Sequence, residues 1–150
     1  MLERWGYQSL SIHSRKCYLQ AMRHAYQVIE RIMLIGKAPL SNLSDEIRVG
    51  QTCEVLLSNQ YIRETDYSGL LRKTITLCLE HRDDVSHELL RKIYTVNTQQ
   101  IDWLETQFRR ISDLGLDGYL DNQLVILSRR AEDFGSKNHL YAHVSGKNSH

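Results

Sequence analysis

Apolar residues recur at helical spacing in three long stretches of the chain. Within residues 9–35, 51–81 and 83–114 they return every three or four positions, which is the spacing of one face of an α-helix. At 1.5 Å per residue, each stretch predicts a helix about 40 Å long. The face predicted for the first helix contains Tyr18, Ala21, Met22, Ala25, Val28, Ile29 and Ile32.

Each of the other two predicted helices carries a polar residue within its apolar row. Glu64 lies in the row of the second helix, and Gln100 lies in the row of the third. Glu64 is a candidate functional residue, because an unpaired carboxylate is costly to bury. The rows consist of Leu57, Tyr61, Glu64, Leu71, Ile75 and Cys78 in the second helix, and of Leu89, Ile93, Val96, Gln100, Leu104, Phe108 and Ile111 in the third.

Glycines and the single proline mark the ends of these stretches. Residues 36–50 contain Pro39 and predict a loop of about fifteen residues, which is long enough for a crossover connection. Gly115 ends the third helix, and residues 117–130 predict a short final helix. Residues 131–150 are polar and contain glycine, so we expect a disordered tail there. Long helices with one long crossover predict an all-α antiparallel bundle over residues 1–130.

Composition narrows the class of protein without identifying a function. The chain has 150 residues, of which 41% are hydrophobic and 25% charged, as expected for one globular domain. A formal net charge of +1 gives no reason to expect a nucleic-acid partner. No apolar run has the length of a membrane span, and the first residues lack the apolar core of a signal peptide. The cysteines Cys17, Cys53 and Cys78 are scattered, so we expect free thiols and a cytoplasmic location.

The sequence contains near matches to the motif by which helical bundles bind metal ions. Such sites use Glu and a Glu-x-x-His step, because residues three apart share one face of a helix. Here Ala21 precedes His24 by three positions, and Asn97 precedes Gln100 by three. Neither step carries the carboxylate, so the spacing alone does not predict a metal site. Glycine-rich phosphate loops and the GxSxG and HExxH motifs are absent from the sequence.

Several segments closely resemble bacterioferritin. They are Met22-Arg-His-Ala25, Ile29-Glu-Arg-Ile32, the IDWLET segment at residues 101–106, Trp5-Gly6 near the start, and Leu114-Gly-Leu116 through Tyr119-Leu120 near the end. The resemblance covers residues 3–123 without a gap. It implies a ferritin-like helical bundle and an iron-storage, haem-binding cage of about two dozen subunits. It also implies that the family's first long helix is missing from this chain. A start codon assigned too late and a truncated relic gene would both explain that difference.

Matched residue by residue to the family, the diiron site is degenerate. His24 and Glu64 are surviving ligands, whereas Ala21, Asn97 and Gln100 replace the other ligands, and the ligand from the missing helix has no counterpart. Amides bind Fe²⁺ far less well than carboxylate or imidazole. The resemblance therefore implies that this chain alone is not a ferroxidase. Two alternatives stay open for the survivors: Glu64 pairs with His24 as a structural contact, or the two retain a single metal ion weakly.

Met22 matches the methionine that ligates haem b in bacterioferritins, one from each of two subunits. A thioether is a soft axial ligand suited to haem iron. Taken alone, a methionine on a helix is usually a packing residue. The surrounding match makes Met22 the predicted cofactor-binding residue.

These inferences favour one function and leave two alternatives. We expect a cytoplasmic iron-storage subunit, with haem b as a candidate cofactor, that assembles as a homo-oligomer or in a mixed cage with a complete bacterioferritin subunit. The first alternative is a non-catalytic relic or a helical interaction protein, because an incomplete bundle exposes apolar faces. The second is a small enzyme that uses His24 and Glu64 for metal-assisted chemistry.

Overall fold

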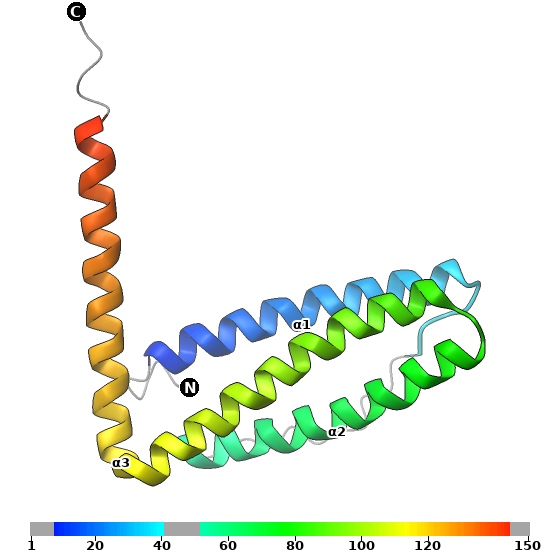
Figure 1. The fold of residues 1–150 in the computed structure, drawn as a ribbon, viewed down its shortest axis with the longest axis horizontal. Helices are drawn as coiled ribbons and strands as arrows, with labels where there is room; N and C mark the ends of the chain where they lie inside the picture. Colours follow the sequence, from blue (N-terminus) through cyan, green and yellow to red (C-terminus); the bar gives the residue numbers. More distant parts are fainter. Residues whose placement is uncertain (1–7, 41–51, 145–150) are drawn as a thin grey trace, which may run out of the picture. The chain divides into compact units, whose positions relative to one another are not determined.

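The part of the chain that the structure describes folds into three α-helices. The computed structural model describes residues 8–40 and 52–144. Within them lie α1 (Gln8–Leu34), α2 (Cys53–Glu80) and α3 (Asp84–Val144), with no β-strand (Figure 1). The all-α class is confirmed, and the predicted helices at residues 9–35, 51–81 and 83–114 correspond to α1, α2 and the first part of α3. No helix in this described part is long and apolar enough to cross a membrane.

The chain divides into two compact units. Residues 17–109 form one unit, and residues 1–16 and 110–150 form the other. In the first unit, parts of α1, α2 and α3 lie side by side (Figure 1), and its buried apolar residues include Leu57, Leu71, Ile93 and Leu104. These four belong to the rows predicted for α2 and α3, and their burial confirms the two rows.

The described part of the second unit is built around the start of α1 and the later part of α3. Leu10 and Tyr119 are buried there. The Ser9 hydroxyl donates a hydrogen bond to Oε1 of Gln123 over 2.9 Å, which joins the two helices through polar side chains. Since Gln123 is itself buried, this hydrogen bond offsets part of the cost of removing its amide from water.

The face predicted for α1 is only partly buried. Val28 and Ile32 are half-buried, as expected for an inward row. Met22, Tyr18 and Ile29 are exposed, with 55%, 62% and 43% of their surface accessible. The described helices therefore cover only one side of the apolar face predicted for α1.

The end of α3 differs from the sequence expectation. Gly115 has φ 69° and ψ 166°, so two helical segments meet there, at the position where the sequence predicts a break. The second segment continues to Val144, beyond the short helix predicted for residues 117–130 and into the predicted tail. Residues 131–144 contain one glycine and no proline, so no strong helix breaker interrupts them. The rest of that tail, most of the predicted crossover loop and the first seven residues lie outside the described residues.

The turn between α2 and α3 is a Schellman motif followed directly by a helix cap. The Asp83 backbone N–H donates to the Cys78 carbonyl, and that of Arg82 donates to the Leu79 carbonyl, over 2.9 and 3.1 Å. Arg82 has φ 55°, the left-handed conformation that glycine adopts at this position without steric cost. Asp83 then caps α3, because its carboxylate accepts a hydrogen bond from the Ser86 N–H over 3.0 Å.

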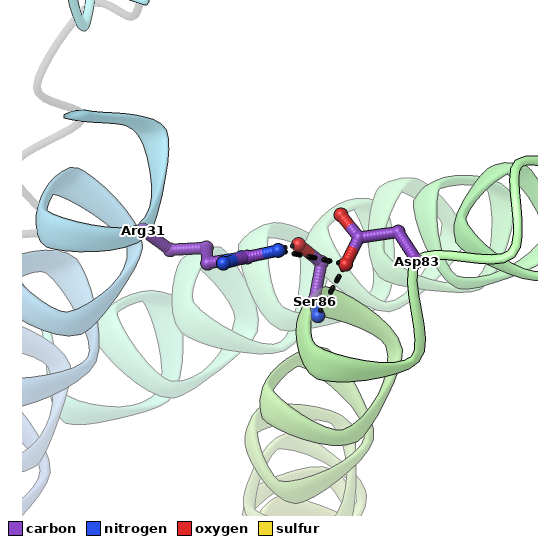
Figure 2. Close-up of polar contacts among 3 residues, drawn as sticks. All are labelled: Arg31, Asp83 and Ser86. Carbon is purple, nitrogen blue, oxygen red and sulfur yellow. Dashed lines mark hydrogen bonds and ion pairs between the residues drawn. The ribbon is translucent and has the colours of Figure 1, made fainter. Parts of the chain in front are cut away.

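Arg31 links α1 to this turn. Its Nη2 lies 2.8 Å from Oδ1 of Asp83, and its Nε donates to the Ser86 hydroxyl over 2.8 Å (Figure 2). Hydrogen bonds from Ser86 and the nearby Arg31 guanidinium hold the pKa of Asp83 below its ordinary value. One arginine therefore bonds both the capping carboxylate and the first turn of α3, which joins α1 to the α2–α3 connection.

The turn yields a first prediction. Arg82→Gly should raise the free energy of unfolding by about 0.5–1 kcal/mol, because glycine adopts the left-handed conformation without the strain of a side chain. Chemical denaturation measures the change. The matched control is Arg91→Gly, at an exposed position inside α3. This substitution should lower the free energy of unfolding by about 1 kcal/mol. Destabilisation by both substitutions would contradict the turn conformation described here.

Candidate functional site

The polar residues matched to a metal site lie around one cavity in the unit of residues 17–109. The cavity has a volume of about 420 Å³, within the range of small-ligand sites. All five matched positions line it. The lining residues are Cys17, Gln20, Ala21, His24, Ala25, Val28, Ile29, Ile32, Pro39, Leu40, Glu64, Tyr67, Ile93, Val96, Asn97 and Gln100.

Helical periodicity explains how three helices place these side chains together. Ala21 and His24 are three apart on α1, and Asn97 and Gln100 are three apart on α3, so each pair shares one helix face. Glu64 lies near the middle of α2. The sequence predicted all five positions, and the structure brings them to a common cavity.

Asn97 binds Glu64 across the interface of α2 and α3. Its Nδ2 donates to Oε2 of Glu64 over 2.7 Å and to the backbone carbonyl of the same residue over 3.0 Å. Asn97 is only 4% exposed, and within the described residues its Oδ1 has no hydrogen-bond partner. The amide of Asn97 thus uses its donor group on the Glu64 carboxylate and leaves an acceptor buried.

The environment of Glu64 disfavours its charged form. Partial burial raises the pKa of the carboxyl above its ordinary value, and the hydrogen bond from Asn97 lowers it by a smaller amount. The ion pairs recorded among the described residues are Arg31–Asp83 and Lys92–Glu88, so Glu64 has no cationic partner there. Burial, with the nearby Glu64 charge, also raises the pKa of Tyr67.

The environment of His24 disfavours its charged form. Burial and the adjacent Arg23 guanidinium lower the pKa of its imidazole. In the described parts of the chain, no hydrogen bond or ion pair joins His24 to Glu64; the carboxylate is bonded to Asn97. The two residues expected to survive as ligands therefore line the same cavity without contacting each other through a polar bond.

Two lining residues, Cys17 and Tyr67, were not predicted from the sequence to lie at this site. Cys17 donates its thiol hydrogen to Oε1 of the buried Gln100 over 3.1 Å, and Tyr67 lies beside Glu64 on α2. The signal for both was present, because Cys17 precedes Ala21 by four positions and Tyr67 follows Glu64 by three. Their one-face spacing could have placed them at the site.

The donor set does not fit a two-iron centre. Within residues 8–40 and 52–144, no three His, Cys, Asp or Glu side chains are grouped so that they could hold a metal ion. A pair of iron ions needs several carboxylates to balance its charge, and here one carboxylate faces an amide N–H. The cavity offers hydrogen-bond acceptors and apolar walls rather than a set of anionic ligands.

Met22 lies on a different face of α1 from the cavity. It is not among the cavity-lining residues, and it is more than half exposed. Neighbouring large apolar residues recur at alternating steps of three and four, the spacing of a coiled-coil seam. We call this exposed set the α1 seam; it consists of Leu19, Met22, Tyr26, Ile29 and Met33.

Comparison with known proteins places the chain in a family. The ferritin-like domain, described as Ferritin, matches residues 1–114. Bacterioferritin BfrA of Mycobacterium tuberculosis is 33% identical over 119 residues, which cover 79% of this chain and 75% of the relative. A bacterial ferritin of Pseudomonas aeruginosa is 30% identical over 125 residues, covering 83% and 80%.

Solved structures agree with this assignment. Two structures of Mycobacterium tuberculosis BfrA are similar to this chain, with TM-scores of 0.75 and 0.78 and 32% sequence identity in each case. They cover 79% and 82% of this chain, and 74% and 77% of their own chains. The family model, the sequence relatives and the helical structure agree, and the chain belongs to the ferritin-like family, with bacterioferritins among its relatives.

Proposed function

We propose that this protein is a bacterioferritin-like subunit that contributes shell and haem b to an iron-storing assembly, whereas a complete partner subunit oxidises Fe²⁺. The observation that carries the proposal is the α1 seam, an exposed apolar stripe with Met22 within it. Exposed apolar faces of this kind need a partner in solution. In the relatives' family the matching methionine ligates haem between two subunits.

The residues around Met22 fit a haem group. A haem combines a planar apolar macrocycle, which the α1 seam could cover, with an iron that accepts a thioether as axial ligand. Arg23 is exposed on the same helix and could pair with a propionate. When bound, the haem would supply one-electron transfer, while Met22 would hold its iron.

The cavity supports the second half of the proposal. Its donor set does not fit a diiron centre, because Asn97 and Gln100 stand where the family pattern has charged or imidazole ligands. The N–H of Asn97 takes the place of a cation beside Glu64. Oxidation of Fe²⁺, the substrate, is therefore assigned to a subunit with both Glu-x-x-His steps.

A helical interaction protein without iron storage is the competing function. The α1 seam is compatible with either function, since both require a partner for the apolar face. Assembly mass and haem content separate them. Co-expression with a complete bacterioferritin subunit, followed by size exclusion with light scattering and haem absorbance, should give a particle many times larger than the 17.6 kDa chain. A small complex without haem would favour the interaction protein.

The haem assignment predicts a specific effect of Met22→Leu. The substitution keeps an apolar side chain in the α1 seam but removes the thioether, so the assembly should form with its haem absorbance lost. Met33→Leu is the matched control, because Met33 belongs to the same seam and is similarly exposed; it should keep the haem. Equal haem content in both variants would rule out Met22 as the ligand.

Iron oxidation tests the assignment of catalysis to a partner. The purified chain should oxidise Fe²⁺ no faster than protein-free buffer, and Glu64→Gln should leave that rate unchanged. The mixed assembly should oxidise Fe²⁺ in proportion to its content of complete subunits. Oxidation by this chain alone that disappears in Glu64→Gln would show that the surviving ligands are active.

The raised pKa of Glu64 predicts a pH-dependent change in stability. A carboxyl whose pKa is higher in the folded chain than its ordinary 4.5 destabilises the fold above the folded pKa, and this cost is lost as the pH falls toward 4.5. Glu64→Gln should therefore raise Tm by a few degrees at pH 7, and the difference should shrink as the pH falls through the folded pKa. Glu80→Gln, at an exposed position on α2, is the control and should show no such trend. A difference that does not change with pH would contradict the desolvation of Glu64.

A further inference from the structure

The cavity between α1, α2 and α3 carries one negative charge that the described chain does not neutralise. Of the side chains that line it, Glu64 is the only Asp, Glu, Lys or Arg within the described residues. Arg23 is exposed on α1 and does not line the cavity. A positively charged ligand would therefore not be repelled by an Arg or Lys side chain of the described cavity wall.

The carboxylate at the cavity wall has capacity for a further hydrogen bond. Asn97 donates to Oε2 of Glu64, while no hydrogen bond is recorded for Oε1 of Glu64 in the part of the chain that the structure describes. Glu64 lines the cavity and is half-buried. A carboxylate in an otherwise uncharged and largely apolar wall is complementary to a ligand that donates hydrogen bonds and carries positive charge.

The remaining wall is mostly apolar. Val28, Ile32 and Ile93 line the cavity together with other aliphatic side chains, so a hydrated metal ion would leave most of the wall without a matching group. An organic cation matches both parts, because its ammonium group pairs with the carboxylate and its hydrocarbon part lies against the aliphatic wall. The volume of about 420 Å³ is sufficient for a small molecule of this kind.

We propose that this cavity binds a small organic amine, with its ammonium group held by the Glu64 carboxylate. The Glu64–Asn97 hydrogen bond fixes the orientation of the carboxylate, and so prepares it for a donor from the cavity side. Tyr67, which lines the cavity beside Glu64, provides an aromatic face to which an ammonium group is attracted. The site shares Ile29 with the α1 seam but does not include Met22, and it does not depend on haem binding or cage assembly.

The test compares three probes of one size: phenethylamine, the neutral 2-phenylethanol and the anionic phenylacetate. Titration of the full chain, followed by NMR chemical shifts and thermal melting, gives an affinity for each. The amine should bind with a Kd of about 1 mM or tighter and at least about tenfold more tightly than the alcohol. Phenylacetate should bind more weakly than either, because its charge repels Glu64.

Two substitutions locate the preference. Glu64→Gln retains the size of the side chain and an oxygen that accepts from Asn97, so it should keep the fold while the amine and the alcohol become equal within about twofold. Glu80→Gln removes one carboxylate from an exposed position of the same helix and should retain the tenfold preference. Circular dichroism checks the fold of both variants.

Three outcomes would overturn the proposal. They are equal binding of amine and alcohol to the unmodified chain, an amine preference that survives in Glu64→Gln, and no saturable binding of any probe. None of them bears on Met22, because haem content and assembly mass are measured without these ligands. Failure of amine binding is thus distinguishable from failure of the proposed shell and haem function.

Discussion

The hydrogen bonds from Asn97 to Glu64 set the character of the bundle interior. Three helices meet there, and each contributes polar side chains to a region that is otherwise aliphatic. Because a buried carboxylate requires compensation, the amide of Asn97 bonds both the side chain and the backbone carbonyl of Glu64. That single side chain joins α3 to α2 and orients the Glu64 carboxylate. It also occupies a position at which the family pattern has a metal ligand.

α1 has two faces with different requirements. One face lines the cavity with small and branched side chains, and the other is the α1 seam, whose large apolar residues are exposed. Ile29 lies at the boundary and belongs to both. Arg31, near the end of the helix, holds α1 to the α2–α3 turn through Asp83 and Ser86. The helix is thus secured to its own chain at the turn, while the α1 seam is available to another chain. A cage subunit needs this combination, because assembly uses the apolar area that the isolated chain leaves in water.

The comparison with bacterioferritins gives the differences their meaning. The fold and family are shared with BfrA of Mycobacterium tuberculosis at about one third identity, and the proposed function has the polar residues of the interior differ in type from the family's ligands while they keep the same positions. Substitution of ligands by amides of similar size retains packing and hydrogen bonding but removes charge. A protein can therefore keep a ferritin-like bundle while the chemistry of its centre changes, because the helices depend on packing and the metal depends on charge.

The sequence by itself determined the local features of this protein. Apolar periodicity predicted the three helices, the buried rows of α2 and α3, and the break at Gly115, since each depends on residues close together in the chain. The resemblance to bacterioferritin identified the five positions around the cavity. Only the tertiary structure decided that Glu64 bonds Asn97 and not His24, that much of the α1 face is exposed, and that Arg31 reaches Asp83. These outcomes depend on which helices meet and at what level, and the periodicity of a single helix carries no information about its neighbours.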